Sequence, residues 1–474
     1  MNISNLTKNK KSQVLIAAIA IIVMLALFGS VSISLLGIQT GQSAVGFVES
    51  SQAFYIAHAG IEWYLQQLSN DNDWTDEVNQ TKDFANGSFT IEVSDANPTR
   101  ISVKSTGKVT GPDGRDRQRY IALIARKIPS AFSFGIFWGR DTNSTLRLDN
   151  SIVNGDLWSI GDAEIEAGSL VSEIAYCPDN QDIIGAGSFY KLQVSSPYLQ
   201  MPQIDETYYD NLISSWDDYI DDHATNSNIT QSSNLVLNGN IIGCRNFTTS
   251  GNITISGNGY IVADRNIDLH SAMFAGTLTV TPSGGNIYFL AGRSLTVGAP
   301  LFGTNVTLNP GAYLYSGAKN NSNLLNIREG LFFSTTDLSA AFIIAKRRIV
   351  VEDGAQVANS TLYVSDVTDS NNYLQIRDSG TTVSGSIISV SGRDPGLIIE
   401  NSASVSGLVY HWGDTSGYTE IDNASITGSV VASQYSNNRI TGSTITYDVD
   451  SIPDILPQGF EYSVTIEPNS WDSL

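Results

Sequence analysis

The sequence predicts a mainly β protein. A long apolar N-terminal α-helix precedes a small antiparallel sheet and a parallel β-helix (β-solenoid) that carries a short helical insertion. Three observations predict this architecture. Val14–Gly37 contains no charge and no proline, and only 15% of the 474 residues are charged. In addition, a short apolar motif recurs along the C-terminal two thirds of the chain. Such recurrence at a fixed period is the signature of a repeat architecture.

The composition narrows the classes of function. The chain has 41 glycines and many Asn, Ser and Thr residues, a mixture that favours strands and turns. Its formal net charge is −21, so no nucleic-acid partner is expected, because phosphate binding needs a basic surface. No zinc spacing, EF-hand loop, Walker A or Rossmann pattern occurs. We therefore expect no cofactor and no metal site of these types, and calcium binding by scattered Asp residues stays open.

The chain has two cysteines, Cys177 and Cys244. In an exported protein two cysteines can form a disulfide. The sequence alone does not show whether these two meet, so their pairing stays open.

The N-terminal segment predicts a membrane anchor. Lys8, Lys10 and Lys11 lie in a basic leader, residues 1–12, just before the apolar stretch Val14–Gly37. About 20 apolar residues cross a bilayer as a helix, and the lysine cluster places the N-terminus in the cytoplasm. A cleaved secretory signal is the alternative. The helical pattern continues without proline to Leu68, which favours one transmembrane and amphipathic helix over residues 13–70 in the inner membrane, with the bulk periplasmic or extracellular.

The second half of this helix carries the most specific motif of the chain. It resembles the QAFYxAEAGIE segment of PilX-type minor pilins of type IV pili, and the matching residues are Gln52, Ala53, Phe54, Tyr55, Ala57, Ala59, Gly60, Ile61 and Glu62. Apolar residues recur at helical spacing here, so one face can dock on the domain that follows. The resemblance implies other pilin-like subunits as partners of the N-terminal helix.

The resemblance also implies that a prepilin peptidase removes the leader between Ser12 and Gln13. Two departures from the family pattern occur there. The family has Gly before the cut, where this sequence has Ser12, and Glu five residues into the mature chain, where this sequence has Ala17.

Residues 71–130 are predicted to form the small sheet. Phe89, Ile91 and Val93 alternate with polar residues, and Gly111–Gly114 reads Gly-Pro-Asp-Gly, a turn sequence. We expect this antiparallel sheet to pack on the N-terminal helix.

Residues 131–450 are predicted to form the β-solenoid. Four similar segments begin at Val351, Ile376, Ile399 and Ile421, which are 25, 23 and 22 residues apart (376 − 351, 399 − 376, 421 − 399). Coils of this length fit one rung of a parallel β-helix. An antiparallel sandwich is the alternative, but it would not produce such a repeat. Residues 451–474 are expected to form a C-terminal tail.

One segment interrupts the array near residues 197–222. Tyr208, Leu212, Trp216 and Tyr219 recur at helical spacing, which predicts an amphipathic helix that braces the side of the solenoid.

Candidate catalytic residues are few. Some β-helices cleave acidic polysaccharides with clustered carboxylates and basic residues. Asp217–Asp218, Asp221–His223 and Lys346–Arg348 are such clusters here, but each is explained as well by solvation of a helix or a strand. We therefore expect no enzyme.

The predicted function is that of a structural or adhesive subunit. It is a minor pilin-like protein of a type IV pilus or a related secretion pseudopilus, which displays the β-solenoid at the cell surface and contacts a surface or glycan ligand. The alternative is a membrane-anchored extracytoplasmic β-helix that binds or degrades polysaccharide.

Overall fold

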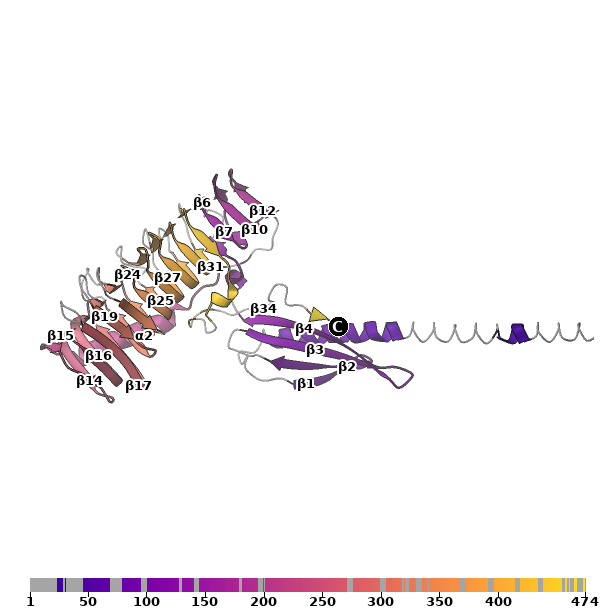
Figure 1. Cartoon of the computed structure of the whole chain (residues 1–474), viewed down its shortest axis with the longest axis horizontal. Helices are drawn as coiled ribbons and strands as arrows, with labels where there is room; N and C mark the ends of the chain where they lie inside the picture. Colours follow the sequence, from indigo (N-terminus) through magenta and orange to yellow (C-terminus); the bar gives the residue numbers. More distant parts are fainter. Residues whose placement is uncertain are drawn as a thin grey trace, which may run out of the picture. The chain divides into compact units, whose positions relative to one another are not determined.

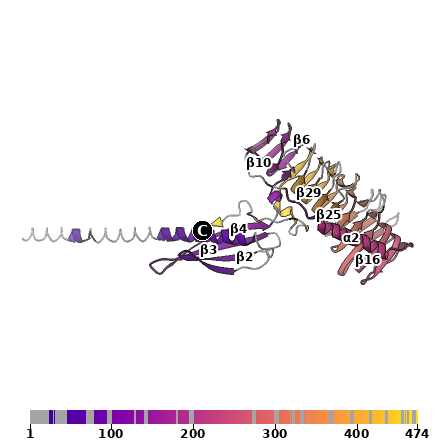
Figure 2. The same cartoon turned by 180° about the vertical axis from the view of Figure 1, so that it is seen from behind.

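The computed structural model divides the chain into two units (Figures 1 and 2). The helix–sheet unit comprises residues 1–127 and 464–474, and the solenoid unit comprises residues 128–463. The solenoid unit is therefore inserted between two parts of the other unit. The structure describes residues 24–28, 30, 46–68, 79–94, 100–127, 130–139, 145–178, 181–194, 199, 201–270, 276–298, 304–317, 319, 324–329, 335–339, 341–365, 372–390, 396–413, 418–433, 438–453, 457, 460, 464–466 and 472–473.

The helix–sheet unit contains the predicted antiparallel sheet. Its strands follow the order β1-β2-β3-β4-β34, and β35 also pairs with β4. The tail predicted at the C-terminus thus completes this sheet, because Val464 pairs with Lys127 and Asp472 with Ala122. The strands are β1 (Asn79–Phe84), β2 (Gly87–Ser94), β3 (Arg100–Thr110), β4 (Asp116–Lys127), β34 (Val464–Ile466) and β35 (Asp472–Ser473).

The predicted long membrane-spanning helix needs correction. Residues 46–68 form a helix, and residues 24–28 are also helical. Within the described ranges, however, no helix is both long and apolar enough to cross a membrane, so the prediction of one such helix over residues 13–70 is wrong. The predicted inner-membrane location depended on that helix and is corrected with it. Most of Val14–Gly37 lies outside the described residues.

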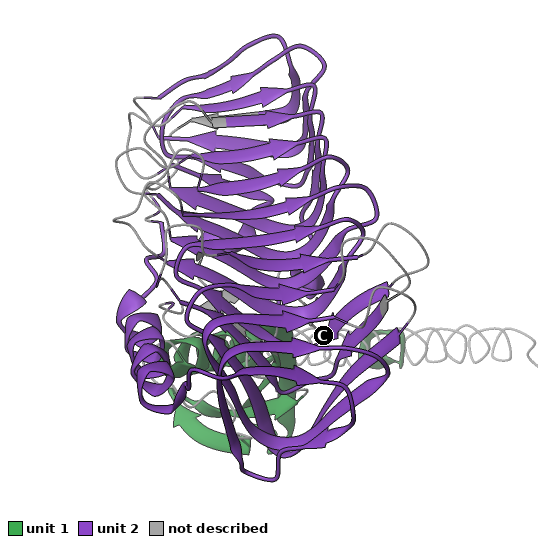
Figure 3. Ribbon diagram, turned by 90° about the vertical axis from the view of Figure 1, so that its left-hand side faces the viewer, with its two compact units in different colours: residues 1–127, 464–474 green, residues 128–463 purple. Residues whose placement is uncertain are grey.

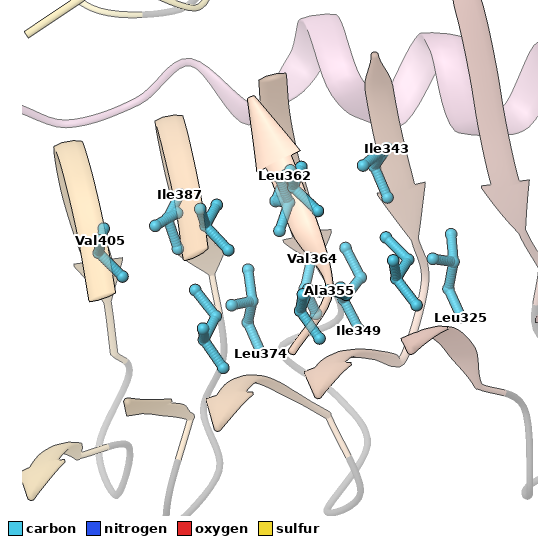
Figure 4. Close-up of a cluster of buried hydrophobic side chains, with 14 of the residues drawn as sticks. Leu325, Ile343, Ile349, Ala355, Leu362, Val364, Leu374, Ile387 and Val405 are labelled. Atoms are coloured by element: carbon cyan, nitrogen blue, oxygen red, sulfur yellow. The ribbon is translucent and has the colours of Figure 1, made fainter. Parts of the chain in front are cut away.

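The solenoid unit confirms the predicted parallel array, and its ladders are parallel throughout the described rungs. Inward side chains from the faces of each rung fill a narrow apolar core (Figure 4). The predicted repeat is the rung itself. Val351 pairs with Ile376, Ile376 with Ile399, and Ile399 with Ile421, on successive rungs.

The rungs are not stacked in sequence order. The stack begins at β13 and β14, rises to the rung of β31, β32 and β33, and continues through β5, β6 and β7 to its other end at β11 and β12. The first strands of the unit therefore stack on its last coil. These first strands are β5 (Ile136–Trp138), β6 (Leu146–Asp149), β7 (Ile152–Asn154), β8 (Leu157–Ser159), β9 (Ala163–Ile165), β10 (Leu170–Cys177), β11 (Ile183–Ile184) and β12 (Ser188–Val194).

The longer arm of the stack runs without interruption from the opposite end to this junction. Its strands are β13 (Asn228–Gln231), β14 (Leu235–Val236), β15 (Ile241–Thr249), β16 (Ile253–Leu269), β17 (Gly276–Ala291), β18 (Leu295–Val297), β19 (Thr304–Leu308), β20 (Ala312–Ser316), β21 (Leu325–Arg328), β22 (Thr335–Ser339), β23 (Phe342–Ala345), β24 (Arg348–Glu352), β25 (Gln356–Ser365), β26 (Tyr373–Arg377), β27 (Thr382–Val390), β28 (Leu397–Glu400), β29 (Ser404–Trp412), β30 (Thr419–Asp422), β31 (Ser425–Ser433), β32 (Asn438–Thr441) and β33 (Thr444–Thr446). Short 3-10 turns, η1 (Ser130–Ser133) and η2 (Val449–Ser451), flank the array.

Helix α2 (Glu206–His223) is the predicted helical segment, and it connects the two ends of the stack. It follows β12 and precedes β13, so it returns the chain along the outside of the array (Figures 1 and 3). Asp205 caps it by accepting a hydrogen bond from the Thr207 amide at 3.0 Å. Its buried stripe is Tyr209, Ile213, Trp216 and Ile220, so Tyr208 and Leu212 lie beside the stripe rather than in it.

One glycine column fixes a corner of the rungs. Gly385, Gly407 and Gly428 pair in successive rungs, and all have positive φ, between +121° and +133°. A Cβ on Gly407 would overlap the carbonyl oxygen of Gly385. Only glycine combines this conformation with such close stacking of backbones.

Candidate functional site

The pilin-like motif lies on helix 46–68, and its inner face packs closely on the sheet. Ala53, Ala57, Gly60 and Ile61 are buried there with apolar residues of β2, β3 and β4. Gly107 on β3 brings the helix near, because a Cβ at this position would overlap the carbonyl oxygen of Ala53. The motif therefore supplies the small residues that let the helix approach the sheet.

Gly60 on the helix allows the same close approach between helix and sheet. A Cβ on Gly60 would overlap the hydroxyl of Ser105 and lie 2.9 Å from the ring of Phe89. Ser105 is itself fully buried on β3. A larger residue at position 60 would therefore separate the helix from the sheet.

The outer face of the same helix exposes several large apolar side chains. The exposed fraction is 74% for Phe47 and 71% for Tyr55, and Val48 is more than half exposed as well. Glu62, one motif residue further along, is also exposed. Solvent-exposed large apolar side chains grouped on one element are typical of surfaces that contact a partner.

Charged residues hold the first turns of the described helix to β4. Glu49 is buried, and its carboxylate lies 3.4 Å from Nε of Arg117, which also pairs with Asp113 at 3.1 Å. Arg119 donates a hydrogen bond to the hydroxyl of Ser50 at 2.7 Å. Arg117 and Arg119 of β4 therefore contact side chains of the helix.

Aromatic rings hold α2 on the solenoid. Tyr209 stacks on Tyr363 of β25 with ring centroids 3.7 Å apart, and Trp216 lies 5.2 Å from Tyr315 of β20. Tyr219 packs on Tyr260 of β16 at 4.6 Å. These three contacts lie along the helix at every second rung of the stack.

The clusters considered as catalytic serve the same attachment. Asp217 accepts a hydrogen bond from the Tyr315 hydroxyl at 2.7 Å and forms an ion pair with Lys346. Asp221 pairs with Lys319 at 2.6 Å. His223 stacks on Tyr219, and its ring nitrogen Nδ1 lies 3.0 Å from the Tyr219 carbonyl. Asp217 and Asp221 therefore attach the helix to the rungs, whereas His223 packs within the helix itself.

Burial changes the acidity of the rings beneath α2. It raises the pKa of Tyr315 well above its ordinary value, and the nearby charge of Asp217 raises it further. Burial likewise raises the pKa of Tyr363 and of Tyr410. These phenols stay neutral at physiological pH, and the hydroxyls of Tyr315 and Tyr410 donate hydrogen bonds to Asp217 and to the carbonyl oxygen of Pro202.

The cysteines lie far apart in the stack. Cys177 ends β10 near one end of the solenoid, and Cys244 lies in β15 near the other, so the structure does not bring them together. Both are buried; the Cys177 thiol lies 3.3 Å from the Gln181 carbonyl oxygen. Burial raises the pKa of Cys244 to about 12. The predicted cleavage residues Ser12 and Gln13 lie outside the described residues.

Sequence reasoning missed a recurrent corner. Ala263-Asp-Arg265, Ala291-Gly-Arg293 and Ala345-Lys-Arg347 share the pattern Ala-x-Arg, each followed two residues later by Ile or Leu. The alanines are buried and the arginines lie at the corner after them. The pattern was visible in the sequence, but its spacing of 28 and 54 residues (293 − 265, 347 − 293) conceals it from a search at one fixed period.

Comparison with known proteins does not assign the chain to a family. No known family matches the sequence, and no curated protein matches it either. A similarity search of solved structures finds the competence-associated pilin ComZ from Thermus thermophilus, with 12% sequence identity over 90% of this chain and 97% of that chain. The TM-score is 0.19, so the similarity carries no argument about fold or function.

Proposed function

We propose that the protein is an extracellular structural or adhesive subunit, a PilX-type minor pilin-like protein whose solenoid is the displayed part. The observation that carries the proposal is the placement of the motif. Residues 52–62 form the part of the helix that packs on the small antiparallel sheet. This role requires no catalytic residue.

The two faces of helix 46–68 have different tasks in this proposal. Its inner face, with Ala53 and Gly60, attaches the helix to its own sheet. Its outer face carries the exposed side chains Phe47, Val48 and Tyr55. The partner that we propose for this outer face is the helix of another pilin-like subunit, which would bury these apolar groups.

The organisation of the chain supports display of the solenoid. Residues 128–463 are inserted before β34. The segments on the two sides of this insertion together form the helix–sheet unit. Each rung mainly contacts its neighbours, which lets such an array extend without changing the unit that carries it.

The test is the presence of the protein in sheared surface fibres. The parent protein should appear in the fibre fraction, and Tyr55→Asp should reduce its share there because a charge would enter the proposed apolar interface. The matched control is Tyr190→Asp, since Tyr190 is 83% exposed on the solenoid strand β12. Immunoblots of fibre and whole-cell fractions provide the measurement.

Two outcomes would contradict the proposal. The parent protein would be absent from the fibres, or the Tyr55→Asp variant would be incorporated as well as Tyr190→Asp at equal cellular levels.

A further inference from the structure

Four consecutive rungs each place at least one cation at the same corner of the solenoid. Ala263, Ala291, Ser316 and Ala345 occupy one register column. Arg293, Lys319 and Arg347 follow the ends of the strands that contain Ala291, Ser316 and Ala345, and Arg265 lies two residues after Ala263 within β16. We call these four residues the basic corner.

Backbone hydrogen bonds confirm that these segments are stacked. The amide of Arg293 donates to the carbonyl oxygen of Arg265 at 2.8 Å, and the amide of Lys319 donates to that of Gly292 at 3.0 Å. Rungs of a parallel β-helix repeat every ~4.8 Å. The corner therefore presents a straight row of positive charges at that interval.

The counter-charges of this row are incomplete. Lys319 is held by Asp221 at 2.6 Å and Asp264 at 3.0 Å, and Arg265 lies 4.0 Å from Asp264. No acidic side chain in the described part of the chain forms an ion pair with Arg293. Its Nε is buried and makes no hydrogen bond there.

Another arginine pair of the solenoid shows the contrast. Arg147 and Arg439 also face each other on adjacent rungs. Each has its own carboxylate: Arg147 pairs with Glu166 at 2.5 Å, and Arg439 pairs with Asp149 at 2.7 Å. The lack of an ion pair is not confined to Arg293, because Arg245 and Arg328 also form none with an acidic side chain in the described part of the chain. Arg293, however, stands in a row of cations on adjacent rungs, and this row indicates a site for an external anion.

The spacing of the row selects the kind of anion. A guanidinium group binds a carboxylate with two parallel hydrogen bonds. Duplex DNA carries about one charge per 1.7 Å of its axis, a density that a single row at ~4.8 Å cannot neutralise. The net charge of −21 would also repel it. A chain of uronic acids, with one carboxylate on each sugar, matches one cation per rung far better.

We propose that the basic corner binds a linear, carboxylated polysaccharide, laid along the stack with its carboxylates on Arg265 and Arg293. This site deepens the adhesive role proposed above, because it names the ligand class. The surface lies on the rungs of the solenoid unit, and its Lys319 already pairs with Asp221 of α2.

The test measures the binding of polygalacturonate oligomers to the full-length protein by isothermal titration calorimetry. The parent protein should bind them saturably, and neutral dextran should give no heat. The double variant Arg265→Gln with Arg293→Gln should weaken binding about tenfold or more, as expected for charge-assisted contacts at a site centre. Added salt should weaken binding to the parent protein.

The control variant removes the same charge elsewhere. Arg147→Gln with Arg439→Gln should bind like the parent, because those arginines are already paired. Thermal unfolding verifies that each variant is folded; if the double variant melts early, Arg293→Gln alone replaces it with the same expected direction. The proposal is overturned if the parent does not bind polygalacturonate, if both double variants lose binding equally, or if duplex DNA binds more tightly.

Fibre incorporation is measured in parallel to separate this proposal from the subunit role. The polysaccharide site is supported if the double variant Arg265→Gln with Arg293→Gln loses binding to polygalacturonate but still enters fibres. A parent protein that binds polygalacturonate but never enters fibres would remove the subunit role and leave the site standing.

Discussion

The backbone amide of Ser443 donates a hydrogen bond to the hydroxyl of Ser151 at 3.3 Å, across 292 positions of sequence. Ser151 in turn donates to the carbonyl oxygen of Ile440 at 3.0 Å, and the amide of Ala424 donates to the Ser443 hydroxyl at 3.0 Å. Buried serines thus join the beginning of the solenoid to its last coil. The apolar core continues across this junction, where Ile445 stacks on Val153.

The stability of the short arm, strands β5–β12, should depend on the last coil, strands β31–β33. Ile445→Asp places a charge in the core between the two segments, at a cost of about 4 kcal/mol in the free energy of unfolding. Hydrogen exchange should then accelerate in β5–β10 as well as in β31–β33. Unchanged protection of β5–β10 would show that the short arm folds independently of the last coil.

The alternation of each rung can be tested at neighbouring positions. Val405 is buried and Ser404 is exposed on β29. Val405→Asp should lower the free energy of unfolding by about 4 kcal/mol, whereas Ser404→Asp should change it by less than about 0.5 kcal/mol. Equal destabilisation in chemical denaturation would contradict the inward and outward assignment.

The glycine column should tolerate no side chain. Gly407→Ala combines an unfavourable φ with overlap on the Gly385 carbonyl, so we expect a loss of about 3 kcal/mol or more. Gly251→Ala is the matched control, because Gly251 has a φ of +90° with no atom within 4 Å of an added Cβ. Gly251→Ala should therefore show only the cost of the unfavourable φ, about 1 kcal/mol. Similar melting temperatures for both variants would refute the packing contribution.

Alkaline pH should destabilise the attachment of α2. Tyr315 has a pKa raised by burial, so its contribution is complete below its unfolded value of about 10 and is lost as the pH rises above it. Each such tyrosine adds a slope of about 1.4 kcal/mol per pH unit to the decline in stability. Tyr315→Phe should reduce this slope above pH 10. The measurement is denaturation at a series of pH values.

The thiol of Cys244 should be protected until the solenoid opens. Its burial raises its pKa to about 12, so the reactive thiolate is scarce at pH 8. Iodoacetamide should label this residue only in denaturant. Because Cys177 and Cys244 lie near opposite ends of the stack, denatured protein should accept two labels without prior reduction. An intact-mass spectrum that shows an internal disulfide would contradict this arrangement.

The rung register could be predicted from the sequence, because Val351, Ile376 and Ile399 lead segments with the same order of apolar, turn and apolar residues. The junction could not. It joins Val430–Ala432 to Ile136–Trp138, two strands that share apolar character but no motif. Stacking between rungs depends on shape and backbone pairing, which different apolar residues satisfy equally well.

The same limit applies to the candidate sites. Helical spacing predicted a helix near residues 197–222, but not that it returns the chain from one end of the stack to the other. That role follows from contacts such as Tyr209 with Tyr363, which are 154 positions apart (363 − 209). The basic corner had a local pattern, Ala-x-Arg, yet its alignment depends on the lengths of the intervening turns.

The insertion of the solenoid into the helix–sheet unit determines how the array would respond to mechanical tension. The chain enters the stack at β5 and leaves it after β33, and these strands belong to neighbouring rungs. A pull transmitted through both connections would therefore load the interface between those two rungs. A ligand held at the basic corner, on the longer arm, would transmit its pull along that arm to these two rungs, whereas strands β8–β12 of the short arm lie outside the path of the force.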